Sequence, residues 1–133
     1  MTPLSRLLRP TSRLVRTVPS VRQMSGLGLP GKVGFIGLGN MGLPMVLNLA
    51  KETEVIAFDL NENSLKEAEQ AGAQQAASIE EIGSSGSSVI FTMLPGCAAV
   101  SAVMPTLLDS AKDCSKIVFV DCSTVCDRFS FVC

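Results

Sequence analysis

The sequence predicts an α/β fold built on a doubly wound parallel sheet. Short apolar runs recur along the chain, segments with helically spaced apolar residues separate them, and a glycine-rich turn follows the first run. Buried strands that alternate with helices pack as a parallel sheet with helices on both faces. At 133 residues and 47% hydrophobic content, the chain has room for one such domain.

The first strand and helix surround the glycines. Residues 33–38 form an apolar run typical of a strand that is covered on both faces. Residues 41–51 then place Met45 and Leu49 on one side of a helix, and Pro44 falls in the first turn, where its missing N–H costs little. We therefore expect a strand, a glycine turn and a helix in that order.

The rest of the chain continues this alternation. The further elements expected are a strand at 54–59, a helix at 62–71, a weak strand at 74–77, a short helix at 78–82, a polar and flexible segment at 83–88, a strand at 89–94, a helix at 97–111 interrupted at Pro105, and a strand at 117–120. With the weak strand included, the expected strand order is 3-2-1-4-5, which is most of a doubly wound sheet.

Basic and acidic residues are unevenly distributed. Five of the eleven basic residues are arginines ahead of position 25, whereas the first acidic residue is Glu52. The leader is also rich in Ser and Thr and amphipathic, a composition typical of a mitochondrial transit peptide. We therefore expect a transit peptide at 1–24 that directs the chain to the mitochondrial matrix, a linker at 25–32 and a folded domain at 33–125. A disordered basic arm is the alternative for the leader.

The composition argues against several functions. The net charge of −1 gives no overall excess that points to nucleic acid or to a membrane surface, and no run approaches the roughly 18 apolar residues of a membrane span. Five cysteines without any histidine show no spacing typical of zinc ligands. We therefore expect no metal site, no nucleic-acid partner and no membrane partner.

The stretch VGFIGLGNMG, residues 33–42, sets three glycines at the spacing G-x-G-x-x-G. In a strand–turn–helix unit, Gly37 permits the tight turn, Gly39 lets the backbone approach a pyrophosphate, and Gly42 lets the helix pack closely on the strand. The free N–H groups of the helix would then point at the phosphate. A purely structural turn is the alternative.

Asp59 closes the second predicted strand, 22 residues after Gly37. A carboxylate there can accept hydrogen bonds from both hydroxyls of an adenosine ribose, and it would repel a 2′-phosphate. With the strand, glycine turn, helix and acid in place, the sequence predicts a Rossmann-type site that prefers NAD over NADP. A solvated strand end is the alternative for Asp59.

Two further motifs end predicted strands, where ligands bind in open parallel sheets. TMLP at 92–95 ends in Pro95, which would fix the chain as it passes over the cofactor. DCST at 121–124 offers two hydroxyls to a nicotinamide ribose or to a substrate carboxylate. Taken singly, each motif is also compatible with a turn or a helix cap.

Taken in this order over residues 33–125, VGFIGLGNMG, Asp59, TMLP and DCST resemble the β-hydroxyacid dehydrogenases. The likeness is greatest to mitochondrial members that oxidise 3-hydroxyisobutyrate to methylmalonate semialdehyde in valine breakdown, with NAD as the hydride acceptor. The resemblance places Ser123 near the substrate carboxylate. It implies that the cofactor is bound by Gly37, Leu38, Gly39, Asn40, Met41, Gly42, Asp59, Leu60, Leu94, Pro95 and Thr124.

The chain departs from the family pattern at two places. Family members usually have asparagine five residues after the leucine of MLP, where this chain has Ala99, and that leaves one polar cofactor contact in question. After Val125 the family continues with a sixth strand and a helical second domain that carries the catalytic lysine. Here a divergent tail, 126–133, follows. We therefore expect a sheet incomplete at its C-terminal side, no catalytic residue within this chain, and no activity of the chain alone.

The predicted function is thus the NAD-binding portion of such a dehydrogenase, which in complete form acts on a small-molecule hydroxy acid. A non-catalytic nucleotide-binding or interaction module is the alternative from another class. A methyltransferase also has a glycine loop before an acid, but TMLP and DCST have no assigned part in it. The resemblance also allows a homo-oligomer like those of the family, although the short length of this chain argues against one.

Overall fold

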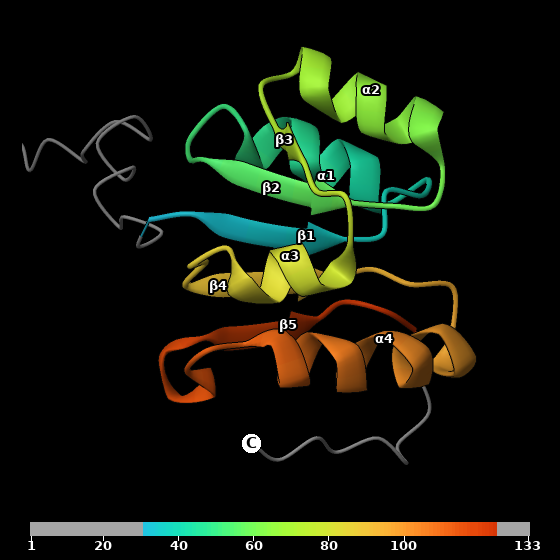
Figure 1. Cartoon of the computed structure of the whole chain (residues 1–133). Helices are drawn as coiled ribbons and strands as arrows, with labels where there is room; N and C mark the ends of the chain where they lie inside the picture. Colours follow the sequence, from blue (N-terminus) through green and yellow to red (C-terminus); the bar gives the residue numbers. More distant parts are fainter. Residues whose placement is uncertain (1–30, 125–133) are drawn as a thin grey trace, which may run out of the picture.

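Five parallel strands form one sheet in the computed structural model, which describes residues 31–124. The strands are β1 (Val33–Ile36), β2 (Val55–Phe58), β3 (Gln74–Gln75), β4 (Val89–Thr92) and β5 (Val118–Asp121). Their order is β3-β2-β1-β4-β5, so the predicted strand order is confirmed (Figure 1). The predicted transit peptide, residues 25–30 of the predicted linker, and the tail at 126–133 lie outside the described residues.

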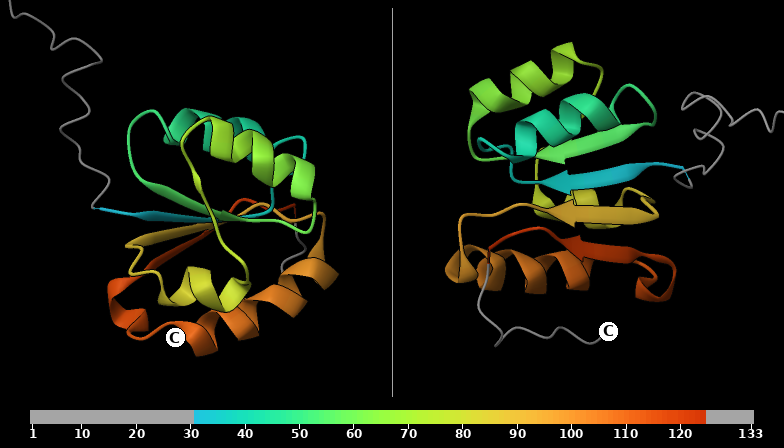
Figure 2. Two further views of the ribbon diagram at one scale, coloured as in Figure 1. Left: turned by 45° about the horizontal axis from the view of Figure 1, so that its top comes forward. Right: turned by 180° about the vertical axis from the view of Figure 1, so that it is seen from behind.

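Helices cover both faces of the sheet. The helices are α1 (Gly42–Leu49), α2 (Glu62–Gln70), α3 (Ile79–Ser84) and α4 (Cys97–Ser110), with a 3-10 helix at Cys114–Lys116. Figure 2 shows α1 and α2 together on one face, and α3 and α4 on the other. Each pair of helices packs on its own apolar core, as expected of a doubly wound fold.

The central strand β1 joins the two cores. All four of its residues are buried, and because alternate side chains point to opposite faces, Phe35 packs toward α1 while Ile36 packs toward α3 and α4. Gly34 leaves room for α3, since a Cβ at this position would lie 2.9 Å from the Ile82 side chain. The continuous apolar run at residues 33–38 therefore contains a strand that is buried on both faces of the sheet.

Two predicted details are wrong. The helix at 97–111 is not interrupted, because α4 continues through Pro105 to Ser110. A proline inside a helix removes one backbone hydrogen bond, and here the buried apolar side of α4, formed by Val100, Met104 and Leu107, holds the helix on the sheet despite that loss.

The segment at 83–88 is also more structured than its polarity suggests. Helix α3 extends to Ser84, and Gly83 is buried where a Cβ would collide with the Ser110 hydroxyl of α4. Ser87 is only 3% exposed, and its hydroxyl lies 2.7 Å from that of Ser85. The serines satisfy one another's hydrogen bonds, which allows this polar stretch to lie between α3 and β4.

Strand β5 lies at one edge of the sheet, and its Val118 side chain is 59% exposed. Within residues 31–124, every helix is too short or too polar to reach from one side of a lipid bilayer to the other. The same residues bring together no group of three metal-ligating side chains.

Candidate cofactor-binding site

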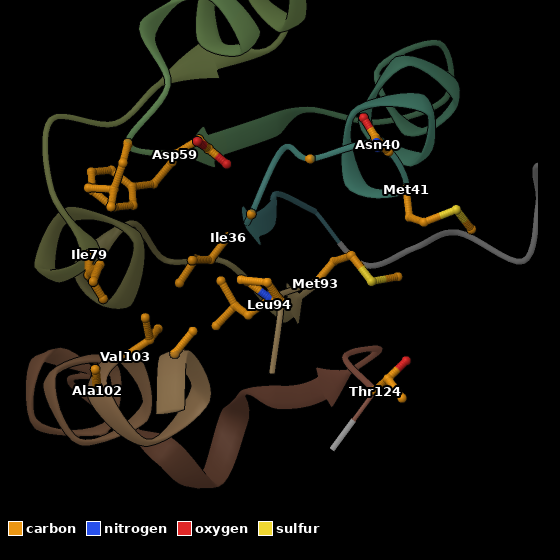
Figure 3. Close-up of a pocket in the computed structure, with 16 residues that line it drawn as sticks. Ile36, Asn40, Met41, Asp59, Ile79, Met93, Leu94, Ala102, Val103 and Thr124 are labelled. Atoms are coloured by element: carbon orange, nitrogen blue, oxygen red, sulfur yellow. The ribbon is translucent and has the colours of Figure 1, made fainter. Parts of the chain in front are cut away.

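A pocket of about 660 Å³ opens at the carboxyl ends of the strands. Its walls come from the loop after β1, the end of β2, the start of α3, the loop after β4, the first turns of α4 and the segment after β5 (Figure 3). This is the edge of a doubly wound sheet where ligands bind, because the strand order reverses there between β1 and β4. The volume lies within the range of roughly 300–1,000 Å³ found for ligand pockets.

The three glycines that follow β1 differ in the space that a side chain would have at each position. Gly37 has φ +99°, and a Cβ there would collide with the Met93 carbonyl oxygen. A Cβ at Gly42 would collide with the Gly37 carbonyl oxygen. A Cβ at Gly39 would meet nothing within 4 Å. The protein's own packing therefore requires glycine at 37 and 42, whereas Gly39 faces open space.

Helix α1 begins at this loop, and its first residues lie at the pocket. The N-terminal cap is Met41, whose side chain makes no capping hydrogen bond, and the first turn contains no acidic residue. The Leu43 N–H bonds back to the Gly39 carbonyl oxygen at 3.1 Å. The positive end of the helix dipole at Asn40 and Met41 thus borders the pocket, and the first turn of α1 contributes no anion to neutralise it.

Asp59 ties the glycine loop to the end of β2. Its Oδ2 accepts a hydrogen bond from the Leu38 N–H at 2.5 Å, and its Oδ1 accepts one from the Asn61 N–H at 2.7 Å. Asn61 in turn caps α2 by accepting the Asn63 N–H at 3.0 Å. Because each carboxylate oxygen has more than one lone pair, Asp59 can still accept hydrogen bonds from a ligand in the pocket.

Side-chain hydrogen bonds join the ends of β4 and β5. Asp121 Oδ1 accepts hydrogen bonds from the Thr92 hydroxyl at 2.9 Å and from the Ser123 N–H at 3.0 Å. The Leu94 N–H donates to the Ser123 hydroxyl at 2.8 Å. Partial burial opposes ionisation of Asp121, but hydrogen bonds from Ser123 and Thr92 outweigh it and lower the pKa of this carboxyl below its ordinary value.

Most of the predicted site residues converge on this pocket. Those that line it are Gly37, Gly39, Asn40, Met41, Asp59, Leu60, Leu94, Pro95 and Thr124. Three predicted residues do not. Leu38 is 1% exposed in the core, Gly42 is buried under the loop, and Ser123 is half-buried with its hydroxyl bonded to the Leu94 N–H.

The sequence did not reveal the apolar part of the pocket. This part is formed by Ile36, Phe58, Ile79, Ala102 and Val103, and Ala99 lies beside it. Ile79 and Val103 come from α3 and α4, whose positions at the sheet edge depend on the crossover connections and cannot be read from local patterns. Thr92 and Asp121 belong to the TMLP and DCST motifs, but their pairing was not predicted, because only the register of β4 on β5 sets them side by side.

Asp59 is the one ionisable residue among the described residues that line the pocket. Lysine, arginine and cysteine do not occur in that lining. The described walls can therefore bind and orient a ligand through backbone N–H groups, one carboxylate, a hydroxyl and apolar contacts.

Comparison with known proteins identifies the family. Residues 32–128 match the profile described as the NAD binding domain of 6-phosphogluconate dehydrogenase. The chain belongs to this family of NAD-binding domains. The match covers all five strands and all four helices that the structure describes.

Curated relatives of this NAD-binding domain are dehydrogenases. The chain is 33% identical over 106 residues to the mitochondrial 3-hydroxyisobutyrate dehydrogenase of Drosophila melanogaster, covering 79% of this chain and 32% of the relative. It is 45% identical over 74 residues to 2-(hydroxymethyl)glutarate dehydrogenase of Eubacterium barkeri, covering 55% of this chain and 24% of the relative. The chain thus spans about a quarter to a third of these relatives.

Solved structures share the same architecture. A 3-hydroxyisobutyrate dehydrogenase from Mycobacterium tuberculosis matches with a TM-score of 0.67 and 31% identity, over 71% of this chain and 32% of that one. The Rossmann-type fold class predicted from the sequence is therefore confirmed, as is NAD as the cofactor of the family.

Proposed function

We propose that the chain is the NAD-binding portion of a dehydrogenase that oxidises 3-hydroxyisobutyrate or a closely similar hydroxy acid. One observation carries the proposal: the glycine loop, Asp59, the 94–95 turn and Thr124 border a single pocket. The names of the relatives support the substrate class. The open space at Gly39 suits a pyrophosphate, since a ligand can approach the backbone there without meeting a side chain.

The proposed pose runs along the pocket from Asp59 to Thr124. The uncapped start of α1 would donate N–H groups to the pyrophosphate, and Asp59 would accept the hydroxyls of the adenosine ribose. Ile79 and Val103 provide an apolar surface for the adenine at the Asp59 end, while Thr124 lies at the other end (Figure 3). When bound, NAD accepts a hydride from the alcohol carbon.

Hydrogen bonding at the start of α2 supports a preference for NAD over NADP. A 2′-phosphate beside Asp59 would need N–H donors or cations, yet the Asn61 N–H is already bonded to Asp59 and the Asn63 N–H to Asn61. Glu62 adds a negative charge in the first turn of α2. A dianionic phosphate here would face carboxylates without a balancing cation in the pocket lining described above.

Nucleotide titration tests the proposal directly. The chain contains neither Trp nor Tyr, so NADH fluorescence can be followed without overlapping emission, and calorimetry gives an independent affinity. We expect NADH to bind and NADPH to bind at least about 10-fold more weakly, because a repelled phosphate costs on the order of 1.4 kcal/mol or more. Absence of NADH binding to the folded full chain would refute the proposal.

A non-catalytic nucleotide-binding module is the second candidate, and the pocket lining favours it for the chain alone. Oxidation of an alcohol needs a base for the hydroxyl proton, and the lining within residues 31–124 offers only Asp59, which we assign to the ribose. An assay of NADH formation with 3-hydroxyisobutyrate and with 2-(hydroxymethyl)glutarate separates the two candidates. Turnover by the full chain would exclude the non-catalytic one.

We further propose a location in the mitochondrial matrix. The basic, acid-free leader at 1–24 supports it, and several relatives carry the word mitochondrial in their names. Import into isolated mitochondria, followed by N-terminal sequencing, tests this proposal. We expect the chain to be imported and residues 1–24 to be removed. A chain that is not imported would contradict the location, and an imported product that still begins at Met1 would contradict removal of the transit peptide.

A further inference from the structure

The hydrogen bonds between the ends of β4 and β5 form a continuous clasp, which we define as Thr92, Leu94, Asp121 and Ser123. The parallel register sets Thr92 beside Asp121, and the Cys122 N–H donates to the Thr92 carbonyl oxygen at 2.8 Å. Thr92 and Asp121 are the last residue pair in the register of β4 on β5. After this pair, a side-chain hydrogen bond joins the two segments, because the Ser123 hydroxyl accepts the Leu94 N–H.

The clasp lies behind one wall of the pocket. Leu94 and Pro95 line the pocket on the β4 side, and Thr124, the residue after Ser123, lines it on the β5 side. Thr92, Asp121 and Ser123 are absent from the lining, and the side-chain network they form reaches the wall at the Leu94 N–H. Met93 connects the same wall to the glycine loop, because its N–H bonds to the Ile36 carbonyl oxygen at 2.9 Å and its own carbonyl packs against Gly37.

We propose that Asp121 and Thr92 are positioning residues that hold the 93–95 wall and Thr124 at a fixed separation for the nicotinamide half of the cofactor. This inference rests on the proposed function. Asp121 and Thr92 do not line the pocket and would not contact the cofactor. They hold in place the residues that would contact it, which are Leu94, Pro95 and Thr124.

The energetics of the clasp favour this role. Thr92 is 3% exposed, so its hydroxyl has Asp121 as its partner rather than bulk water. Hydrogen bonds to an ionised carboxylate are roughly twice as strong as neutral ones, and the lowered pKa of Asp121 keeps this group ionised. Loss of Asp121 removes the acceptor of the Ser123 N–H, and loss of the Thr92 hydroxyl removes the bond that ties Asp121 to β4. Either change therefore loosens Ser123, whose hydroxyl accepts the Leu94 N–H of the wall.

Two nucleotides of different length test the proposal on the full chain. ADP extends only over the Asp59 half of the pocket, whereas NADH reaches the wall at Leu94 and Thr124. We expect Thr92→Val, which keeps the side-chain shape, to weaken NADH binding by about 5- to 10-fold and ADP binding by less than about 2-fold. The matched control Thr92→Ser keeps the hydroxyl and should restore NADH affinity.

Asp121 is tested in the same way. Asp121→Ala removes the shared acceptor and should match Thr92→Val, while Asp109→Ala removes an exposed carboxylate from α4 and should change neither affinity. Asp121→Asn, which keeps side-chain size and one acceptor oxygen, is used if either variant fails to fold. Thermal unfolding establishes that each variant is folded before its affinities are compared.

Hydrogen exchange gives a readout that needs no ligand. The Leu94 amide should lose protection in Thr92→Val and Asp121→Ala, while that of Gly37, bonded at 3.0 Å to the Phe58 carbonyl oxygen, should keep its protection.

The outcomes separate this inference from the proposed function. If the native chain binds neither ADP nor NADH, the proposed function fails and the inference fails with it. If the native chain binds NADH but Thr92→Val lowers both affinities equally, or lowers neither, only the positioning role is overturned. Unchanged protection at Leu94 in the folded variants would likewise overturn it.

Discussion

The two rims of the pocket are built by different means. The rim at the glycine loop depends on backbone conformation and on missing side chains, because Gly37 has φ +99° and a Cβ at Gly37 or Gly42 would collide with a carbonyl oxygen. The rim at the ends of β4 and β5 depends on side-chain hydrogen bonds around Asp121. A substitution at the first rim should therefore act through steric collision, and one at the second through lost hydrogen bonds.

The largest effect is expected at the first rim, for Gly37→Ala. The new Cβ would collide with a backbone carbonyl that cannot move without displacing β4, and the positive φ adds strain. We expect the free energy of unfolding to fall by about 3 kcal/mol or more, measured by urea unfolding with circular dichroism.

A matched control isolates the collision. Gly72 has the same φ of +99°, but a Cβ there would meet nothing within 4 Å. Gly72→Ala should therefore cost only the backbone term of about 1–2 kcal/mol. Equal losses for the two variants would show that packing against Met93 is not what requires glycine at position 37.

Loss of Asp59 should give the next largest effect, because this carboxylate has two functions at the first rim. Asp59→Ala removes the proposed ribose acceptor and also the acceptor of the Leu38 N–H. We expect NADH to bind about 10- to 100-fold more weakly, from hydrogen bonds to a charged group worth about 1.5–3 kcal/mol. NADPH binding should fall less, since a repulsive charge is lost as well. An unchanged ratio of the two affinities would contradict the proposed basis of NAD preference.

These two variants also show which features could be predicted from the sequence. The glycine spacing and Asp59 are local signals, since each role follows from residue type and position after a strand. The strand order followed from the alternation of elements and was confirmed. The function of Asp121 could not be predicted, because its partner Thr92 lies 29 residues away and only the β4–β5 register pairs them.

The continuity of α4 at Pro105 escaped prediction for a related reason. Local preference disfavours proline within a helix by about 3 kcal/mol, but the buried contacts of Val100 and Leu107 come from packing across the domain. Residue type and local spacing thus suffice to predict the first rim, whereas the second rim and the course of α4 depend on tertiary structure.

Gly39→Ala tests the first rim without disturbing its fold. A Cβ there meets no protein atom, and φ is not positive, so the free energy of unfolding should change by less than about 1 kcal/mol. NADH binding should nevertheless weaken by about 10-fold, because the methyl group would occupy the proposed approach of the pyrophosphate. Native affinity in this variant would place the pyrophosphate elsewhere.

Ala99→Asn tests whether the wall near α4 can gain affinity. Ala99 is half-buried and lines the pocket, where the resemblance implied a polar contact. One added hydrogen bond is worth about 0.5–1.5 kcal/mol net, so NADH should bind about 2- to 10-fold more tightly. Ala98, the exposed neighbour outside the pocket lining, provides the control, and Ala98→Asn should leave the affinity unchanged.

The smallest effect is expected in the pH dependence of stability, and it belongs to the second rim. Because the pKa of Asp121 is lowered in the folded state, its ionised form contributes stability above the ordinary carboxyl range, and this contribution is lost as the pH falls through the lowered pKa. Asp121→Asn should therefore flatten the decline in melting temperature below about pH 4. Glu80 and Asp113 also have lowered pKa values and remain in the variant, so part of the decline should persist. An identical acid decline in the variant would mean that the clasp holds Asp121 no more tightly when it is ionised than when it is protonated.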